Sequence, residues 1–191
     1  IVPAEQAPLY AIFHAIMSFC NAGFDLFAGL PQYPNGIPSD PISLLIMGFL
    51  IILGGLGIPV YMNLIYSRNK RGLTLHTKVT LVIALVLILV GWAGLLAAEY
   101  WHNGVLAGMP PVDRIVNAWF QSVSARTAGF ASLPGFSQMQ FSSILLITIL
   151  MMIGAGPAST GGGITTGTFA VLLFAVFSYA RGYDHIRIGK R

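Results

Sequence analysis

The chain has 191 residues, of which 55% are hydrophobic and only 8% are charged, and its formal net charge is +4. A soluble domain carries about 25% charged residues, so this composition excludes a protein whose whole surface faces water. Three long stretches contain no Asp, Glu, Lys or Arg: 41–67, 79–98 and 127–180. Because a bilayer-spanning helix needs about 20 apolar residues, the sequence predicts an all-α integral membrane protein embedded in a lipid bilayer.

The positive charge is concentrated in two places. Eight of the ten Lys and Arg residues lie between 68 and 78 or between 181 and 191, and five of the six acidic residues lie in other segments. Basic residues accumulate on the cytoplasmic side of membrane proteins, so we expect both clusters to be cytoplasmic and not to bind nucleic acid. The chain opens at Ile1 without an initiator Met, and we expect it to be a piece of a longer polypeptide.

The first elements are a short apolar segment, a loop and two spans. Residues 8–20 are too few to cross a bilayer, and they lead into Asn21-Ala22-Gly23-Phe24. Residues 43–66 are expected to form a span that ends at the first basic cluster. Residues 79–98 form a second span that runs back out, and the Gly- and Pro-containing segment 99–111 is typical of an external loop.

The same pattern then begins again. Residues 113–125 are another short, mostly apolar segment, and they lead into Thr127-Ala128-Gly129-Phe130. Each copy therefore places an Ala-Gly-Phe loop behind a segment that cannot span, followed by a turn-rich loop and a long apolar stretch. We interpret this as an internal repeat.

The uncharged stretch 141–180 is too long for one straight helix, which would extend about 60 Å, roughly twice the hydrocarbon core. Its centre holds five glycines and a proline in ten residues: Gly154, Ala155, Gly156, Pro157, Ala158, Ser159, Thr160, Gly161, Gly162 and Gly163. That composition does not hold a stable helix. Non-helical backbone at membrane depth is tolerated only inside protein or beside a water-filled cavity. The sequence thus predicts one crossing interrupted by a non-helical segment.

The two Ala-Gly-Phe loops have the construction of an ion filter. Backbone carbonyls can replace the hydration shell of a cation, and glycine lets them turn inward. The C-terminal end of each short helix adds a partial negative charge. We therefore predict that these residues form a filter, with the phenylalanines as aromatic anchors: Asn21, Ala22, Gly23, Phe24, Thr127, Ala128, Gly129 and Phe130. Two surface turns capped by glycine are the alternative.

Three phrases resemble the Trk/Ktr/HKT superfamily of potassium transporters, in particular its KtrB-like membrane subunits. They are Phe-His-Ala-Ile…Asn-Ala-Gly-Phe at 13–24, Ser-Ala-Arg-Thr-Ala-Gly-Phe at 124–130, and Gly-Ala-Gly-Pro-Ala-Ser-Thr-Gly-Gly-Gly-Ile at 154–164. The resemblance covers nearly the whole chain. It implies helix–pore loop–helix units arranged as four repeats around one pore, with re-entrant filter loops and one broken transmembrane helix.

The resemblance also implies roles for the parts. Residues 1–67 would hold the pore loop and second helix of the second repeat, residues 68–191 the third repeat, and residues 154–163 a gate. The transported ion would be potassium, with sodium as a further candidate, and the chain itself would need no cofactor. Expected partners are a second membrane subunit, forming a homodimer, and a cytoplasmic nucleotide-binding regulatory ring. Thr165 stands where many members carry lysine, which leaves the role of that lysine open.

Several single residues have a structural interpretation. Arg126 beside the second loop is expected to clamp an acidic or carbonyl partner rather than contact an ion. His14 is expected to be a hydrogen-bonded packing residue, and Cys20 a small buried one. The glycines of the first span are expected to permit close packing: Gly54, Gly55 and Gly57.

Two other function classes are alternatives. An intramembrane enzyme needs an acid, a base or an activated nucleophile within a span, and the spans contain no acidic or basic residue. A secondary transporter of another small solute would explain the interruption at 154–163, but not the two matched loops. Potassium translocation is therefore the function that the sequence predicts.

Overall fold

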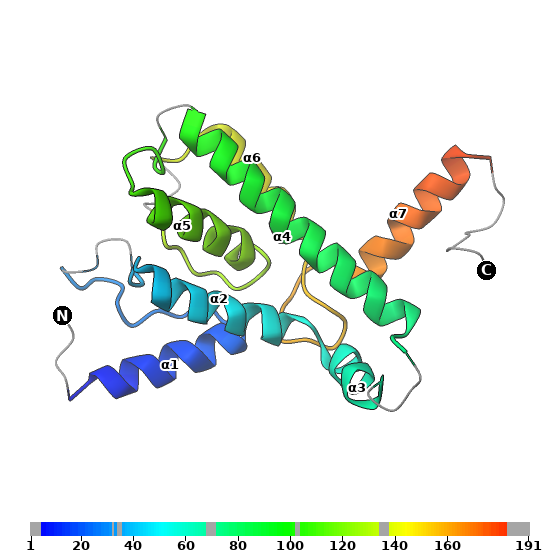
Figure 1. Cartoon of the computed structure of the whole chain (residues 1–191), viewed down its shortest axis with the longest axis horizontal. Helices are drawn as coiled ribbons and strands as arrows, with labels where there is room; N and C mark the ends of the chain where they lie inside the picture. Colours follow the sequence, from blue (N-terminus) through cyan, green and yellow to red (C-terminus); the bar gives the residue numbers. More distant parts are fainter. Residues whose placement is uncertain are drawn as a thin grey trace.

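The computed structural model describes residues 5–31, 33, 36–67, 72–101, 104–133 and 138–182. These residues form seven α-helices and one isolated bridge, between Ile153 and Ile164. The helices are α1 (Ala7–Phe19), α2 (Pro41–Gly55), α3 (Ile58–Ser67), α4 (Leu75–Trp101), α5 (Pro111–Ser124), α6 (Phe141–Met152) and α7 (Thr166–Ala180) (Figure 1).

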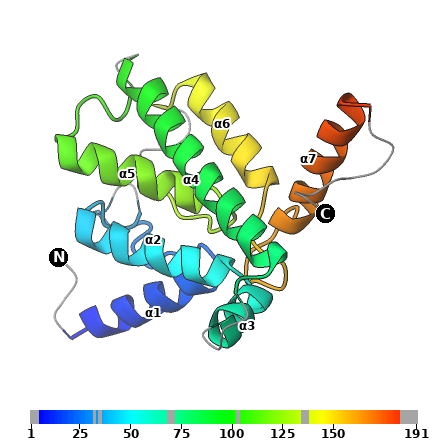
Figure 2. The same cartoon turned by 45° about the vertical axis from the view of Figure 1, so that its right-hand side comes forward.

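Helix α4 organises the rest of the fold. Its 26 residues Leu75–Tyr100 are long and apolar enough to cross a membrane, which confirms the span expected at 79–98. Helices α5 and α6 pack against it, and α2 packs against α5 with α1 on its far side (Figures 1 and 2). Helix α7 contacts α4 near the start of α4 and then projects away from the other helices.

The span expected at 43–66 is apolar and long enough to cross a membrane, but it is sharply bent. Helices α2 and α3 meet at an angle of 88°. Gly57 between them has a left-handed φ of 87°, and Pro59 follows in the first turn of α3. A proline there has no N–H to continue the helix from α2. The broken helix predicted at 141–180 is therefore not the only one among the described residues.

The short helices are as expected. Helix α1 has 13 residues and α5 has 14, so neither spans a bilayer. The interruption of 141–180 is also confirmed, because α6 ends at Met152 and α7 begins at Thr166. The two copies of the repeat thus share an order: a short helix, a loop, and a second helix that breaks.

Two apolar clusters hold the helices together. One lies among α1, α2, α5, the segment after Phe24 and the second Ala-Gly-Phe loop, and Phe27, Leu44 and Phe120 belong to it. The other joins α4, α5 and α6 through residues such as Leu95 and Ile147. Many large apolar side chains on the outer faces of α1, α2 and α7 stay exposed, including Ile42 and Phe177. Such faces suit contact with lipid or with other membrane helices.

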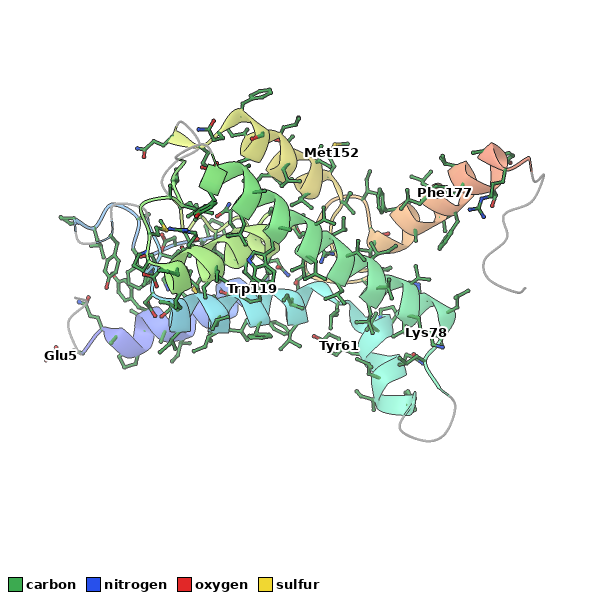
Figure 3. The ribbon with its side chains drawn as sticks, turned by 45° about the horizontal axis from the view of Figure 1, so that its top comes forward. Glu5, Tyr61, Lys78, Trp119, Met152 and Phe177 are labelled. Carbon is green, nitrogen blue, oxygen red and sulfur yellow. The ribbon has the colours of Figure 1, made fainter. Side chains whose placement is uncertain are left out.

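The ends of the molecule fit the expected orientation. Lys78, beside the first basic cluster, and Phe177, near the second, lie at one end, and Glu5 lies at the opposite end (Figure 3). Most residues of the two basic clusters fall outside the described residues, so their cytoplasmic location stays a prediction.

Candidate functional site

The first glycine loop follows directly from the end of α1. The last turn of α1 is closed by bonds from the backbone N–H groups of Cys20 and Ala22 to the carbonyl oxygens of Ile16 (2.8 Å) and Met17 (3.0 Å). Asn21 and Gly23 both adopt left-handed backbone conformations, with φ of 51° and 70°. Such conformations end the helix and turn the chain.

The second loop repeats this geometry after α5. Thr127 and Gly129 have φ of 73° and 82°, in the same alternation as Asn21 and Gly23. The N–H groups of Ala128 and Gly129 both bond to the Ser124 carbonyl oxygen, at 3.0 and 3.3 Å. The Ser124 hydroxyl donates to the Phe130 carbonyl oxygen at 2.5 Å. Two segments 106 positions apart in the sequence therefore share an uncommon backbone pattern.

The two loops lie against each other. A Cβ atom added to Gly23 would lie 2.6 Å from the Ala128 carbonyl oxygen and 3.1 Å from the Gly129 Cα. The close approach of the second loop leaves no room for a side chain at position 23, and the positive φ there is strained for any residue but glycine. A cavity of about 330 Å³ opens at this junction, with Gly23, Gly129 and the Asp25 side chain among its lining residues.

The phenylalanines of the two loops differ. Phe130 is 3% exposed and packs in the first apolar cluster, as an anchor would. Phe24 is 67% exposed, so its expected anchoring role is wrong in this structure. Phe27, three residues later, takes the buried place instead and packs on the rings of His14 and Tyr10.

The segment between α6 and α7 is folded on itself. The N–H of Gly154 donates to the Ile164 carbonyl oxygen (2.9 Å), and the N–H of Ile164 donates to the Met152 carbonyl oxygen (3.1 Å). It also fills the break of the other long helix. The Gly156 N–H donates to the carbonyl oxygen of Gly55 (2.7 Å), and the Ile58 N–H donates to the carbonyl oxygen of Ala158 (3.1 Å). Its buried backbone groups thus find partners without a helix, as a membrane environment requires.

Three side-chain bonds connect this segment to the glycine loops. Arg126 Nη2 donates to the Gly154 carbonyl oxygen at 3.2 Å, which confirms the expected carbonyl clamp. Asn21 Nδ2 donates to Thr160 Oγ1 at 2.8 Å. The Gly162 N–H donates to Thr127 Oγ1 at 3.2 Å. The two Ala-Gly-Phe loops and the 154–163 segment therefore contact one another.

His14 is a buried packing residue, as expected, but its partner was missed. Its Nε2 lies 2.9 Å from Asp25 Oδ1 and its Nδ1 lies 2.7 Å from the Tyr10 carbonyl oxygen. Asp25 also accepts from the Phe27 N–H at 2.8 Å. The signal was present in the sequence, because Asp25 directly follows Phe24 in a chain with only six acidic residues.

Two further residues differ from or extend the expectations. Cys20 is exposed, not buried. The buried side chains of α1 are His14 and Ser18, and a residue two positions after Ser18 points to the other side of a helix. Thr165 has a structural role as the N-cap of α7, where its hydroxyl oxygen accepts from the Thr168 N–H at 3.3 Å.

Gly54 and Gly57 permit close packing, although against loop or helix-end backbone rather than against another spanning helix, whereas a Cβ at Gly55 would make only an ordinary contact with the Ala155 Cβ at 3.6 Å. A methyl group at Gly54 would overlap the Phe19 carbonyl oxygen, and one at Gly57 would overlap that of Pro157. These glycines let the end of α1 and the 154–163 segment approach α2 closely.

The fold is shared with a solved membrane protein. It is similar to the crystal structure of the potassium transporter TrkH from Vibrio parahaemolyticus, with a TM-score of 0.67 at 19% sequence identity. The match covers 97% of this chain and 40% of that one.

Curated relatives are similar in sequence over almost the whole chain. The chain is 38% identical to Ktr system potassium uptake protein B of Bacillus subtilis (strain 168), over 95% of its length and 40% of the relative's. It is 37% identical to the protein of the same name in Vibrio alginolyticus, over 98% of the chain and 41% of the relative. It is 34% identical to potassium/sodium uptake protein NtpJ of Enterococcus hirae, over 91% of the chain and 37% of the relative. The chain thus spans about 40% of the length of the relatives that it matches.

A family model described as TrkH, cation transport protein, matches residues 4–187. That match confirms the resemblance stated from the sequence and the expectation that the chain is not an enzyme. The chain belongs to the TrkH family of cation transport proteins.

Proposed function

We propose that the chain forms part of the pore of a potassium uptake system, in which residues 21–24 and 127–130 supply two segments of the ion filter. The observation that carries this proposal is the pair of matched loops. Each loop follows a helix too short to span, and each has left-handed backbone at the same two positions. The two loops are in contact at Gly23 and Gly129. Residues 1–67 are then the pore loop and second helix of one repeat, and residues 68–191 are the next repeat around the same pore.

The chemistry of the loops suits a cation. Their side chains include no acid or base, so coordination would come from carbonyl oxygens, assisted by the negative ends of α1 and α5. The Asp25 carboxylate borders the cavity at the junction of the loops and would raise the local cation concentration. Potassium is proposed because relatives are named potassium uptake proteins, and sodium is a further candidate because one is named a potassium/sodium uptake protein.

The 154–163 segment is the proposed gate. It contacts both filter loops and the break between α2 and α3, and much of it rests on backbone and single side-chain bonds rather than on a packed apolar core. A segment held in this way can change shape at small cost. Relatives are named as proteins of a Ktr system; a second membrane subunit, forming a homodimer, and a cytoplasmic nucleotide-binding regulatory ring remain the proposed partners.

A secondary transporter of another small solute is the rival function. Its substrate site would lie at broken helices, and the described part of the chain has two of them. The paired left-handed loops favour the pore, because a solute site does not need a repeated filter geometry.

The experiment compares ion preference in glycine variants of the full-length protein, expressed in cells that lack their own potassium uptake. Gly129→Ser is the main variant, because the nearest atom to an added Cβ there is 3.5 Å away, whereas Gly23→Ser meets a carbonyl oxygen at 2.6 Å. We expect each to lower the preference for potassium over sodium by about tenfold or more, because altered carbonyl positions no longer match one ion. Gly72→Ser is the control, because Gly72 has a left-handed φ of 65° and open space around it and lies outside the proposed filter. Unchanged preference in both filter variants would rule out the assignment.

A further inference from the structure

The two filter loops are connected to the gate segment at the same place in each repeat. Asn21 and Thr127 both lie two positions before the filter glycine, and both have positive φ although neither is glycine. Such backbone is strained for a residue with a Cβ, and most of all for a β-branched residue such as threonine. It persists where the surrounding structure holds it in place.

The side chains of these two residues bind the 154–163 segment. Asn21 Nδ2 donates to Thr160 Oγ1 at 2.8 Å, and Thr127 Oγ1 accepts from the Gly162 N–H at 3.2 Å. The partners are 139 and 35 positions away along the chain. The two strained residues are thus held by neighbouring residues of a single short segment.

Thr160 makes the more extensive of the two connections. Besides accepting from Asn21, its hydroxyl lies 3.1 Å from the carbonyl oxygens of Phe19 and Gly54. Phe19 is the last residue of α1 and Gly54 lies at the end of α2. One hydroxyl group therefore joins the end of the first short helix, the first filter loop and the first broken helix.

We propose that Thr160 and Gly162 are positioning residues for the filter, so that movement of the 154–163 segment changes ion preference as well as ion passage. This inference rests on the proposed filter and gate, and it adds that the two are mechanically one unit. When the segment moves, Asn21 and Thr127 lose the bonds that hold their left-handed backbone. The carbonyl groups between them and the filter glycines are then free to reorient.

The test is a pair of substitutions at Thr160 in the full-length protein. Thr160→Val keeps the shape and removes the hydroxyl, and Thr160→Ser keeps the hydroxyl and removes a methyl group. Uptake of rubidium, which stands in for potassium, and uptake of sodium are measured in the same cells. We expect Thr160→Val to lower the rubidium-over-sodium uptake ratio by about five- to tenfold, the effect of losing one or two hydrogen bonds. Thr160→Ser should keep the ratio within about twofold of that of the unchanged protein.

A double variant separates coupling from general damage. If Asn21 acts on the filter through Thr160, Asn21→Ala combined with Thr160→Val should lower the ratio no further than the stronger single variant. Additive losses would overturn the link. Should Thr160→Val fail to reach the membrane, Thr160→Ala removes the same hydroxyl group without overfilling the site and carries the same expectation.

The outcomes distinguish this inference from the function on which it rests. If Gly129→Ser lowers the ratio and Thr160→Val changes only the total uptake, the filter and gate stand and the coupling is wrong. If neither variant changes the ratio, the filter assignment fails and the coupling fails with it.

Discussion

Arg126 donates from Nη2 to the carbonyl oxygen of Gly154, 28 positions further along the chain, at a distance of 3.2 Å. This bond joins the end of the second short helix to the first residue of the 154–163 segment. Arg126 is partly buried, so the bond between its charge and this carbonyl group is worth about 1.5–3 kcal/mol. It is a main restraint on the segment.

Replacing Arg126 with Gln should therefore loosen that segment. We expect amide hydrogen exchange within 154–163 to become roughly 10- to 100-fold faster in the purified protein, because local opening loses this restraint. Arg114→Gln is the matched control. Arg114 bonds to the carbonyl oxygens of Leu106, Ala107 and Met109 and should not affect the segment. Equal exchange rates in the Arg126 variant and the unchanged protein would contradict the clamp.

Gly54→Ala should destabilise the whole fold. An added methyl group would overlap the Phe19 carbonyl oxygen, and backbone cannot move aside as a flexible side chain can. Overpacking of this kind costs about 1–3 kcal/mol, visible as a lower thermal unfolding midpoint in detergent. Gly108→Ala, with open space around it, should change stability by less than about 0.5 kcal/mol. A Gly54 variant as stable as the Gly108 variant would show that this close approach is not needed.

Removing part of the gate segment should raise ion flux. Deletion of residues 159–162 takes away the bonds to both filter loops, and we expect faster rubidium uptake that depends less on the regulatory partner. Uptake is normalised to the amount of protein in the membrane. Loss of uptake in a variant that still folds and reaches the membrane would instead make the segment a required binding site.

The two basic clusters should face the cytoplasm. In a Cys20→Ser background, which removes the exposed native thiol, cysteines at Asn69 and Gly189 should resist a membrane-impermeant reagent in intact cells. A cysteine at Gly108, in the expected external loop, should react. Basic residues are retained on the inner side during insertion, which is the reason for the expectation. The opposite labelling pattern would invert the topology.

Composition and glycine spacing predicted most of the framework. The non-spanning lengths of α1 and α5, the long span at α4 and the interruption at 154–163 all follow from counting apolar residues against the bilayer thickness. The break between α2 and α3 was missed, although Gly57 followed by Pro59 is a local signal for it. Uniform hydrophobicity across 43–66 concealed that signal.

The site was predicted as a set of segments but not as a network. Glycine at 23 and 129 can be read from a repeated phrase, because a positive φ favours that residue. The bond from Asn21 to Thr160 cannot be predicted from the sequence, because the two residues are 139 positions apart. Their approach depends on how α1, α2 and the 154–163 segment pack. The exposure of Phe24 was not predicted either, because the phrase itself does not show that Phe27, three residues later, packs on His14.

The most direct test of the filter is to locate a bound ion. Thallium scatters anomalously and substitutes for potassium, so crystals of the full-length protein grown with thallium should show anomalous density between the loops 21–24 and 127–130. The density should lie within coordinating distance of their carbonyl oxygens and should weaken in Gly129→Ser. Strong density elsewhere in the membrane region, with none between these loops, would contradict the account.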